Sequence, residues 1–475
     1  MTTYETSWGN MTLPNTCSHR RFRMSQHAAT SATAVQASTF AAYRLSAHLL
    51  SFLAPLLRTL DQQLDRRLVS TFLATLIAIV QWRNRNHGLL LSELGAYLLS
   101  PEQAPAGTKR LSNLLRSERW KASLLADWLW QRANARVQAL YATGAQPLLI
   151  WDGSVLEKSE TVKHPDLCAV RSSKARRLKR IRPGFFNPPG GRPICVPGLN
   201  WLGLLILGRS GAPTVAAMRW WTKRGERRSD QQTELRSLLT QSVAAWGRTV
   251  LHIWDREFAS AAWVCQMIAT NSRFVVRWKK RNKLLDGWGE ARKAWEITRG
   301  KRSWAYRYVR DSHTGEQHKL GVVASCVTHP AHPQPLWLVV ARPGRDLEPW
   351  YLLTSEPIRS VEDAWAVVFA YGRRWQIECA WRYSKSELAM ESPRVWTWER
   401  REKLLLMVTL IYAFLLSLLA SEWEELRNWL LRAWCHRTGK RSREVAAPLY
   451  RLRSALSRLW QAYLPAPGAR RLTSG

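Results

Sequence analysis

Acidic residues are scarce in this chain. Its 475 residues include 35 Asp and Glu against 71 Lys and Arg, and the formal net charge is +36. Such an excess of positive charge implies a polyanionic partner, and nucleic acid is the commonest one. An anionic membrane surface is the alternative. Tryptophan is abundant, with 27 residues, and it can pack in a core or stack on bases.

Cysteine is also sparse and irregularly placed. The chain has seven cysteines, and no two of them have the Cys-x-x-Cys spacing. This absence argues against a zinc knuckle or a disulfide framework, so a reducing cytoplasm is the expected compartment. The N-terminus has no charged segment followed by an apolar one, and a secretory signal is therefore not expected.

Long apolar runs are almost absent. The best candidate extends from Leu404 to Ala420 and is flanked by charged residues. It falls just short of the ~20 residues that a membrane span needs. We therefore expect a buried helix of a large domain here and no membrane partner.

Changes in residue pattern predict several parts along the chain. Three consecutive apolar runs, followed by alternating strand and helix patterns, predict a mixed α/β sheet with helices on its faces. The predicted parts are a disordered arm (1–40), a helical DNA-binding domain (41–145), an α/β catalytic core (146–281 and 350–400), a β-rich insertion (282–349) and a helical C-terminal region (401–475).

Two basic segments favour contact with nucleic acid. The helix expected at 109–119 is rich in Lys and Arg and follows another short helix, as in a helix-turn-helix DNA reader. A helical packing domain with a solvated basic face is the alternative. The loop at 171–183 is dense in cations, and phosphate contact or simple solvation would account for it.

The stretch from Tyr371 to Lys385 is predicted to be a single helix with an unusual face. That face has one carboxylate among cations and aromatic rings, which suits a metal ligand beside bound phosphates. A solvated salt-bridge face is the alternative. Its residues are Tyr371, Arg374, Trp375, Glu378, Arg382 and Lys385.

Two aspartates follow short apolar runs that we interpret as buried strands. Asp152 follows the run 147–151, and Asp255 follows the run 249–254. Ligands of open α/β sheets bind beyond the carboxyl ends of strands. An Asp at such a position is also often only a turn residue or a helix cap, so neither aspartate identifies a site alone.

Together with Glu378, these aspartates form a candidate set of metal ligands. Converging carboxylates repel each other unless cations neutralise them, and two Mg2+ (or Mn2+) ions would do so. Such ions would activate a water or a 3′-hydroxyl and stabilise the leaving oxygen in phosphodiester cleavage. Ligation by oxygen alone favours these metals over zinc.

The spacing Tyr-x2-Arg-x3-Glu-x6-Lys, which begins at Tyr371, resembles the signature of the insertion-sequence-four family of DDE transposases. These are bacterial enzymes of the cut-and-paste type. The segment Leu149–Ser154 resembles the motif around the family's first Asp, and Ile253–Phe258 resembles the second. The β-rich insertion lies between the second Asp and the Glu, where this family has one.

This resemblance implies a ribonuclease H-like core in which Asp152, Asp255 and Glu378 are the catalytic, metal-binding triad. It implies a nucleoid-associated bacterial protein that acts on double-stranded DNA, at element ends and target, as a homodimer. DNA contacts are implied at Tyr371, Arg374, Lys385, Trp350 and Trp375.

The two tryptophans resemble residues that stack on a flipped base in members with a hairpin mechanism. Burial in the core is the alternative for Trp350. A domesticated, non-catalytic DNA-binding protein that keeps the transposase fold is the alternative for the whole chain.

Overall fold

The computed structural model of the chain describes residues 11–12, 31–82, 88–158, 160, 164–172, 195–311, 317–344, 347–435 and 449–464. Most of the basic loop predicted at 171–183, and most of the arm predicted at 1–40, lie outside these residues. The expectation of disorder is wrong for residues 31–40, because a helix begins at Ser31 and continues to Gln63.

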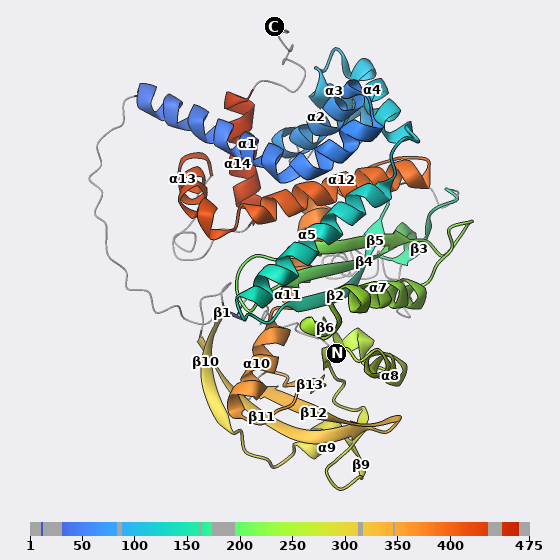
Figure 1. The fold of residues 1–475 in the computed structure, drawn as a ribbon, viewed down its shortest axis with the longest axis vertical. Helices are drawn as coiled ribbons and strands as arrows, with labels where there is room; N and C mark the ends of the chain where they lie inside the picture. Colours follow the sequence, from blue (N-terminus) through green and yellow to red (C-terminus); the bar gives the residue numbers. More distant parts are fainter. Residues whose placement is uncertain are drawn as a thin grey trace, which may run out of the picture.

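Helices from both ends of the chain form a layer at one end of the molecule (Figure 1). The N-terminal ones are α1 (Ser31–Gln63), α2 (Arg66–Trp82), α3 (Leu91–Leu98), α4 (Ala104–Arg116) and α5 (Ala122–Ala142). The C-terminal ones are α12 (Trp398–Ser417), α13 (Glu424–Trp434) and α14 (Leu449–Tyr463). Because α12 packs against α2, α4, α5 and α14, the two terminal regions share a core. The division into domains stays a prediction.

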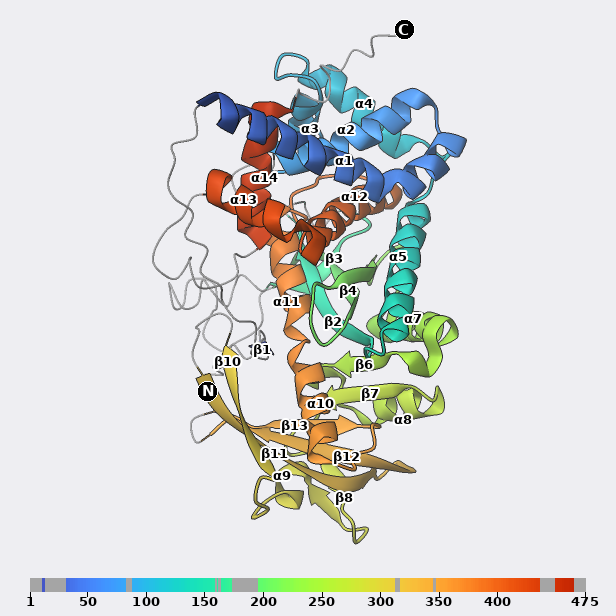
Figure 2. The ribbon, with the colours of Figure 1, turned by 60° about the vertical axis from the view of Figure 1, so that its left-hand side comes forward.

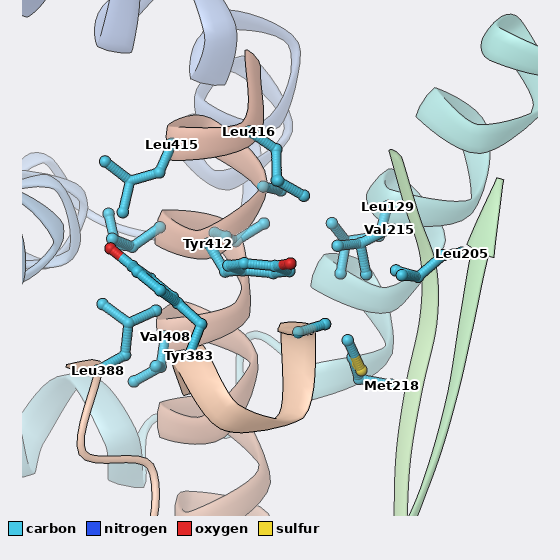
Figure 3. Packing of buried hydrophobic residues seen from close by; sticks show 14 of the residues in the cluster. Leu129, Leu205, Val215, Met218, Tyr383, Leu388, Val408, Tyr412, Leu415 and Leu416 are labelled. Carbon is cyan, nitrogen blue, oxygen red and sulfur yellow. The ribbon is translucent and has the colours of Figure 1, made fainter. Parts of the chain in front are cut away.

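The central helix of this layer is α12. Every residue from Lys403 to Leu416 is buried, which confirms the buried helix that the sequence predicts around 404–420. A helix that is apolar on all sides must be covered on all sides. Tyr412 of α12 points toward the sheet residues Leu205 and Val215, and its ring centroid lies 5.5 Å from that of Tyr383 (Figure 3).

Membrane-spanning potential is limited to two places in the described residues. The helix Thr33–Gln63 is long and apolar enough to cross a membrane. A second span would exist only if α12 and the bent segment after it, Ser421–Trp434, crossed the membrane together as one span. Core helices of folded proteins meet the same criterion, and α12 is such a helix here.

In the described part of the chain, 13 strands form one mixed sheet with the order β1-β10-β11-β12-β13-β7-β6-β2-β4-β3, and β5, β8 and β9 join beside this path. The first half of the chain contributes β1 (Met11–Thr12), β2 (Leu148–Glu157), β3 (Cys168–Arg171), β4 (Cys195–Leu207) and β5 (Thr214–Trp221). The second half contributes β6 (Leu251–Trp254), β7 (Arg273–Arg277), β8 (Lys283–Leu285), β9 (Ala291–Lys293), β10 (Ala305–Asp311), β11 (Gln317–His329), β12 (His332–Arg342) and β13 (Trp350–Thr354).

Five strands in the order β5-β4-β2-β6-β7 form the core of this sheet. β2, β4 and β5 are antiparallel neighbours, whereas β6 is parallel to both β2 and β7. Three antiparallel strands followed by two parallel ones make up a ribonuclease H-like core, so the predicted fold class is confirmed. The strands predicted within 282–349 are also present, and β10, β11 and β12 extend the same sheet beyond β13.

Alternation along the strands buries both faces of the core sheet. Leu148 and Ile150 of β2 belong to one hydrophobic cluster, and Leu149 and Trp151 belong to another. The helices α7 (Gln231–Trp246) and α8 (Ala261–Ala269) cover one face, and α10 (Val361–Gly372) and α11 (Trp375–Arg382) cover the other (Figure 2).

The stretch from Tyr371 to Lys385 is not the single helix that the sequence predicts. α10 ends at Gly372, α11 begins at Trp375, and a π-helical turn follows from Tyr383 to Glu387. The physical reason is a tightened junction, in which the backbone N–H of Arg374 donates to the carbonyl of Tyr371 at 2.9 Å. The predicted common face is therefore broken, and Arg382 is exposed while Tyr371 is buried.

Candidate active site

The first candidate ligand, Asp152, lies inside a strand and not at its carboxyl end as predicted. β2 continues to Glu157, because its antiparallel pairing with β4 continues that far. The parallel pairing of β2 with β6 stops earlier, at Ile150 opposite Ile253. Asp152 therefore lies where β2 has lost its parallel neighbour, and its side chain is buried.

Asp255 follows β6 directly and caps a short 3₁₀ helix. Its Oδ1 accepts a hydrogen bond of 2.6 Å from the backbone N–H of Arg256. Asp255 lies two residues beyond Ile253, just as Asp152 lies two residues beyond Ile150, so the register of the two strands brings the aspartates together at one edge. The side chain of Asp255 is 30% exposed and faces the edge of the core.

Glu378 reaches the same place from α11 through an ion pair. The guanidinium of Arg374, one helical turn before Glu378, contacts the carboxylate of Glu378 and lies 3.7 Å from Oδ2 of Asp255. Arg374 is 9% exposed, and its Nη1 has no hydrogen-bond partner among the described residues. One buried cation therefore joins two of the three predicted carboxylates.

The electrostatics of the site connect all three carboxylates to this cation. Burial lowers the pKa of Arg374, but Tyr371 and the carboxylates of Asp255, Glu378 and Asp152 outweigh that effect and raise it. Burial raises the pKa of Asp152 to about 7, with Arg374 opposing the shift and the other two carboxylates adding to it. The set is thus a cluster of negative charge that a central positive charge stabilises.

A tryptophan that sequence reasoning missed holds Asp152 in place. The indole Nε1 of Trp381 donates a hydrogen bond of 2.9 Å to Oδ2 of Asp152, and the backbone N–H of Gly153 donates to Oδ1 at the same distance. Trp381 lies three residues after Glu378 on α11. A helical neighbour at that spacing faces the same side as Glu378, which is the signal that could have found it.

Two further signature residues also contact the site. The hydroxyl of Tyr371 donates a hydrogen bond of 3.2 Å to Oδ1 of Asp255, and burial raises the pKa of this hydroxyl so that it keeps its proton. The ammonium of Lys385 donates a hydrogen bond of 2.8 Å to Oγ of Ser154, two residues beyond Asp152 on β2. Both residues therefore lie against the strands that carry the aspartates.

The two predicted stacking tryptophans lie in different environments. Trp350, the first residue of β13, is only 8% exposed and packs edge to face against Tyr371, with ring centroids 5.2 Å apart. Trp375, the first residue of α11, is partly exposed, and the guanidinium of Arg382 lies 5.7 Å from its ring centroid. Trp350 therefore packs in the core in this conformation, whereas Trp375 is accessible.

The carboxylates do not form a closed metal site as they stand. Within the described residues, no group of three or more His, Cys, Asp or Glu side chains is gathered so that it could hold a metal ion. The donor set nevertheless has the right chemistry, since all three side chains offer oxygen and two of them already contact a cation, the guanidinium of Arg374. The same oxygens would suit a hard divalent cation once Arg374 released them.

Comparison with known proteins agrees with this core. Residues 223–414 match the family model of the transposase DDE domain. This part of the chain resembles a transposase core. The match includes Asp255 and Glu378 and begins after Asp152, so the first aspartate rests on the geometry alone.

A solved structure, the cryo-EM structure of a piggyBac transposase synaptic complex with hairpin DNA, is also similar. Its TM-score is 0.40 at 12% sequence identity, over 86% of this chain and 74% of the other. No curated protein matches the chain. The narrower assignment to the insertion-sequence-four family stays a prediction.

Proposed function

We propose that this protein is a DDE transposase that cleaves the ends of its DNA element and joins the freed 3′-hydroxyl to target DNA. The observation that carries the proposal is that Arg374 contacts Asp255 and Glu378 and that its charge also acts on the buried carboxyl group of Asp152. The match of residues 223–414 to the transposase DDE domain supports it.

Asp152, Asp255 and Glu378 would hold two divalent ions, Mg2+ or Mn2+. When bound, such ions supply an activated nucleophile and a stabilised leaving oxygen for phosphodiester cleavage. Binding by all three carboxylates requires Arg374 to give up its contacts with Asp255 and Glu378. Arg374 is then free to pair with a DNA phosphate, for which its planar donors are well suited.

The other residues of the site position these groups and the DNA. Trp381 holds the buried carboxylate of Asp152 through its indole N–H, and Tyr371 holds Asp255 through its hydroxyl. Lys385 presents a positive charge beside the same strand edge and is expected to contact the DNA backbone. Replacing Lys385 with Ala would then weaken DNA binding and reduce its dependence on salt.

A cut-and-paste reaction through a DNA hairpin is the finer form of this proposal. It needs extruded bases that stack on aromatic rings, and Trp375 is accessible for this purpose. Trp350 is buried against Tyr371, so stacking on Trp350 would require that pair to separate. The hairpin is therefore a separate prediction from cleavage.

Duplex DNA would be held partly by the N-terminal helices. α3 and α4 approach so closely that a Cβ at Gly107 would lie 2.1 Å from the carbonyl oxygen of Gly95. This tight pair leaves Lys109, Arg110 and Arg116 of α4 exposed, as a DNA-reading helix requires. We expect the protein to bind both element ends as a homodimer.

A nicking assay tests the proposal directly. DNA carrying the inverted repeats that flank the coding region should be nicked in the presence of Mg2+ or Mn2+ and not in EDTA. Asp152→Asn, Asp255→Asn and Glu378→Gln should each abolish nicking while DNA binding remains. Glu257→Gln is the matched control, because Glu257 is exposed and lies only two residues beyond Asp255.

The same assay distinguishes the alternative, a domesticated DNA-binding protein without catalysis. Specific binding of the inverted repeats with no nicking under any metal condition would support that alternative. Full nicking by any of the three triad variants would refute the assignment of the triad.

A further inference from the structure

Three exposed aromatic side chains lie at the start of β10, before Arg310 and Asp311, where β1 pairs with this strand. Several strands of the sheet separate β10 from β2 (Figure 1). The residues are Trp304, Tyr306 and Tyr308, which are 46%, 57% and 66% exposed. Successive side chains of a strand point to opposite faces, so residues at this spacing share one face. Folded proteins rarely expose several large aromatic rings side by side without a binding role.

On the opposite face of the same strand, side chains contact α10 or are buried. Arg307, between the two tyrosines, is ion-paired with Glu362 at 2.6 Å, and its guanidinium lies 5.2 Å from the ring centroid of Trp365 on α10. Val309 is buried. Contacts with α10 therefore hold β10 in place on this face. The exposure of the aromatic rings on the other face does not result from poor packing of the strand.

The face that carries the aromatic row also carries positive charge. The register places Tyr308 opposite Lys319, and Tyr306 opposite Gly321, which in turn lies opposite Arg342. The Nζ of Lys319 lies 4.6 Å from the ring centroid of Tyr306. Lys301 reaches this face too, because its ammonium donates a hydrogen bond of 2.9 Å to Oγ of Ser325.

A glycine leaves room for one of these rings. A Cβ at Gly321 would lie 2.9 Å from Cε1 of Tyr306, so only glycine allows the ring to lie this close to β11. The ring of Tyr306 is therefore held near the sheet while more than half of the residue stays exposed. A fixed, exposed ring is what a stacking partner requires.

We propose that Trp304, Tyr306 and Tyr308 form a stacking platform for an unpaired strand of DNA. Unpaired bases offer flat aromatic faces, and the phosphates between them would pair with Lys319 and Lys301. Arg342 donates to the backbone carbonyls of Lys301 and Thr298 and would add only its positive charge. Platforms that combine aromatic rings with cations bind single strands with little sequence preference. The chain's net charge of +36 agrees with such a polyanionic occupant.

Duplex DNA fits this surface less well. In a duplex the base faces are stacked on one another, so three exposed rings would have nothing to stack on except at an end. The charged residues that share this face with the rings are cations, so a basic protein partner is disfavoured. An acidic protein partner would not explain the row of aromatic rings. The platform goes beyond the proposed cleavage reaction and does not depend on the carboxylate triad.

The test measures binding of a fluorescein-labelled thymidine oligonucleotide of ~15 nucleotides, near the upper site size of such platforms. Fluorescence anisotropy is recorded with the full-length protein in EDTA, so that cleavage cannot contribute. The variants compared are the triple change Trp304→Ala/Tyr306→Ala/Tyr308→Ala and the ring-preserving triple change of the same residues to Phe. Trp288→Ala is the matched control, since Trp288 is 89% exposed at the β8–β9 turn outside the row.

The alanine variant should lose about tenfold or more in affinity for the oligonucleotide. The phenylalanine variant and Trp288→Ala should bind as the wild type does, and affinity for a duplex of the same length should change little. Equal losses for the single strand and the duplex, or full affinity in the alanine variant, would overturn the proposal. Failure of phenylalanine to restore binding in a folded protein would also overturn it.

The test is independent of the proposed function. Because the triad variants keep all three rings, Asp255→Asn should bind the oligonucleotide as the wild type does. Loss of nicking with retained single-strand binding, or the reverse, therefore distinguishes failure of one proposal from failure of the other.

Discussion

The indole Nε1 of Trp381 donates a hydrogen bond of 2.9 Å to Oδ2 of Asp152, although the two residues are 229 positions apart in the chain. Both side chains are buried. The ring of Trp381 lies over Gly203, which is the β4 residue opposite Asp152, and packs edge to face on Trp201 at 4.2 Å between ring centroids. The indole of Trp381 thus orients the carboxylate of Asp152 and also packs against the neighbouring strand β4.

Replacing Trp381 with Phe tests this role as a positioning residue. The variant keeps a ring over Gly203 and removes the N–H, so Asp152 loses an oriented donor while the core stays packed. We expect divalent-metal affinity to fall by about 10–100-fold, as when an outer hydrogen bond to a metal ligand is removed. Isothermal titration with Mn2+ and a thermal melt measure the two effects. A large drop in thermal stability with unchanged metal affinity would show that Trp381 only packs.

Gly203→Ala tests the same contact from the other side. A Cβ at residue 203 would lie 2.2 Å from Cη2 of Trp381, so the ring must move and Asp152 must lose its hydrogen bond. We expect a loss of ~1–3 kcal/mol in the free energy of unfolding, together with loss of nicking. Chemical denaturation and the nicking assay measure these effects.

Gly153→Ala is the matched control for that substitution. Gly153 lies on β2 beside Asp152, and the nearest atom to a Cβ there is Nε2 of Gln231 at 3.8 Å. This variant should stay close to the wild type in stability. If both alanine variants lose stability equally, close packing at Gly203 is not the cause.

Arg374→Gln tests whether the guanidinium competes with metal for the carboxylates. Arg374 contacts both Asp255 and Glu378, so a divalent ion must displace it to use them. Without DNA, the variant should bind Mn2+ about tenfold more tightly than the wild type, a typical coupling between two ligands. Calorimetric titration measures this, with Arg382→Gln on the exposed side of α11 as control. Weaker Mn2+ binding by Arg374→Gln would mean that Arg374 supports the metal and does not compete with it.

Lys158 predicts a pH dependence of stability. Its ammonium is buried and donates to the carbonyls of Glu391 and Pro393, and burial lowers its pKa to about 7. Between this value and the unfolded pKa of ~10.4, the unfolded chain binds more protons than the folded one. The contribution of Lys158 to the free energy of unfolding therefore rises with pH, by on the order of 2 kcal/mol from about pH 7 to 9.

Lys158→Met should remove this rise, because methionine does not titrate. Urea denaturation at several pH values gives the comparison. The free energy of unfolding of the wild type, relative to that of the variant, should rise by on the order of 2 kcal/mol between about pH 7 and 9. A difference that is the same at every pH would show that the lysine keeps its charge in the folded state.

Much of the fold was accessible from local sequence patterns. A nearly unbroken apolar run predicted the buried helix around 404–420. Short apolar runs predicted the strand that contains Asp152 and the strand that Asp255 follows. These patterns are local because burial of a helix or strand depends on which of its own faces are apolar. The types and spacing of the carboxylates, and the cations beside them, were likewise visible in the chain.

The arrangement of the site was decided only by tertiary structure. Strand pairing, which joins distant segments, placed Asp152 inside β2 and brought it beside Asp255. The composition of the stretch from Tyr371 to Lys385 favours one continuous helix, but the junction at Arg374 interrupts it. Tertiary packing, which the local sequence does not show, overrides helix propensity there. The contact between Trp381 and Asp152 exists because a glycine on a third segment leaves room for the indole, and no pattern within either segment encodes that space.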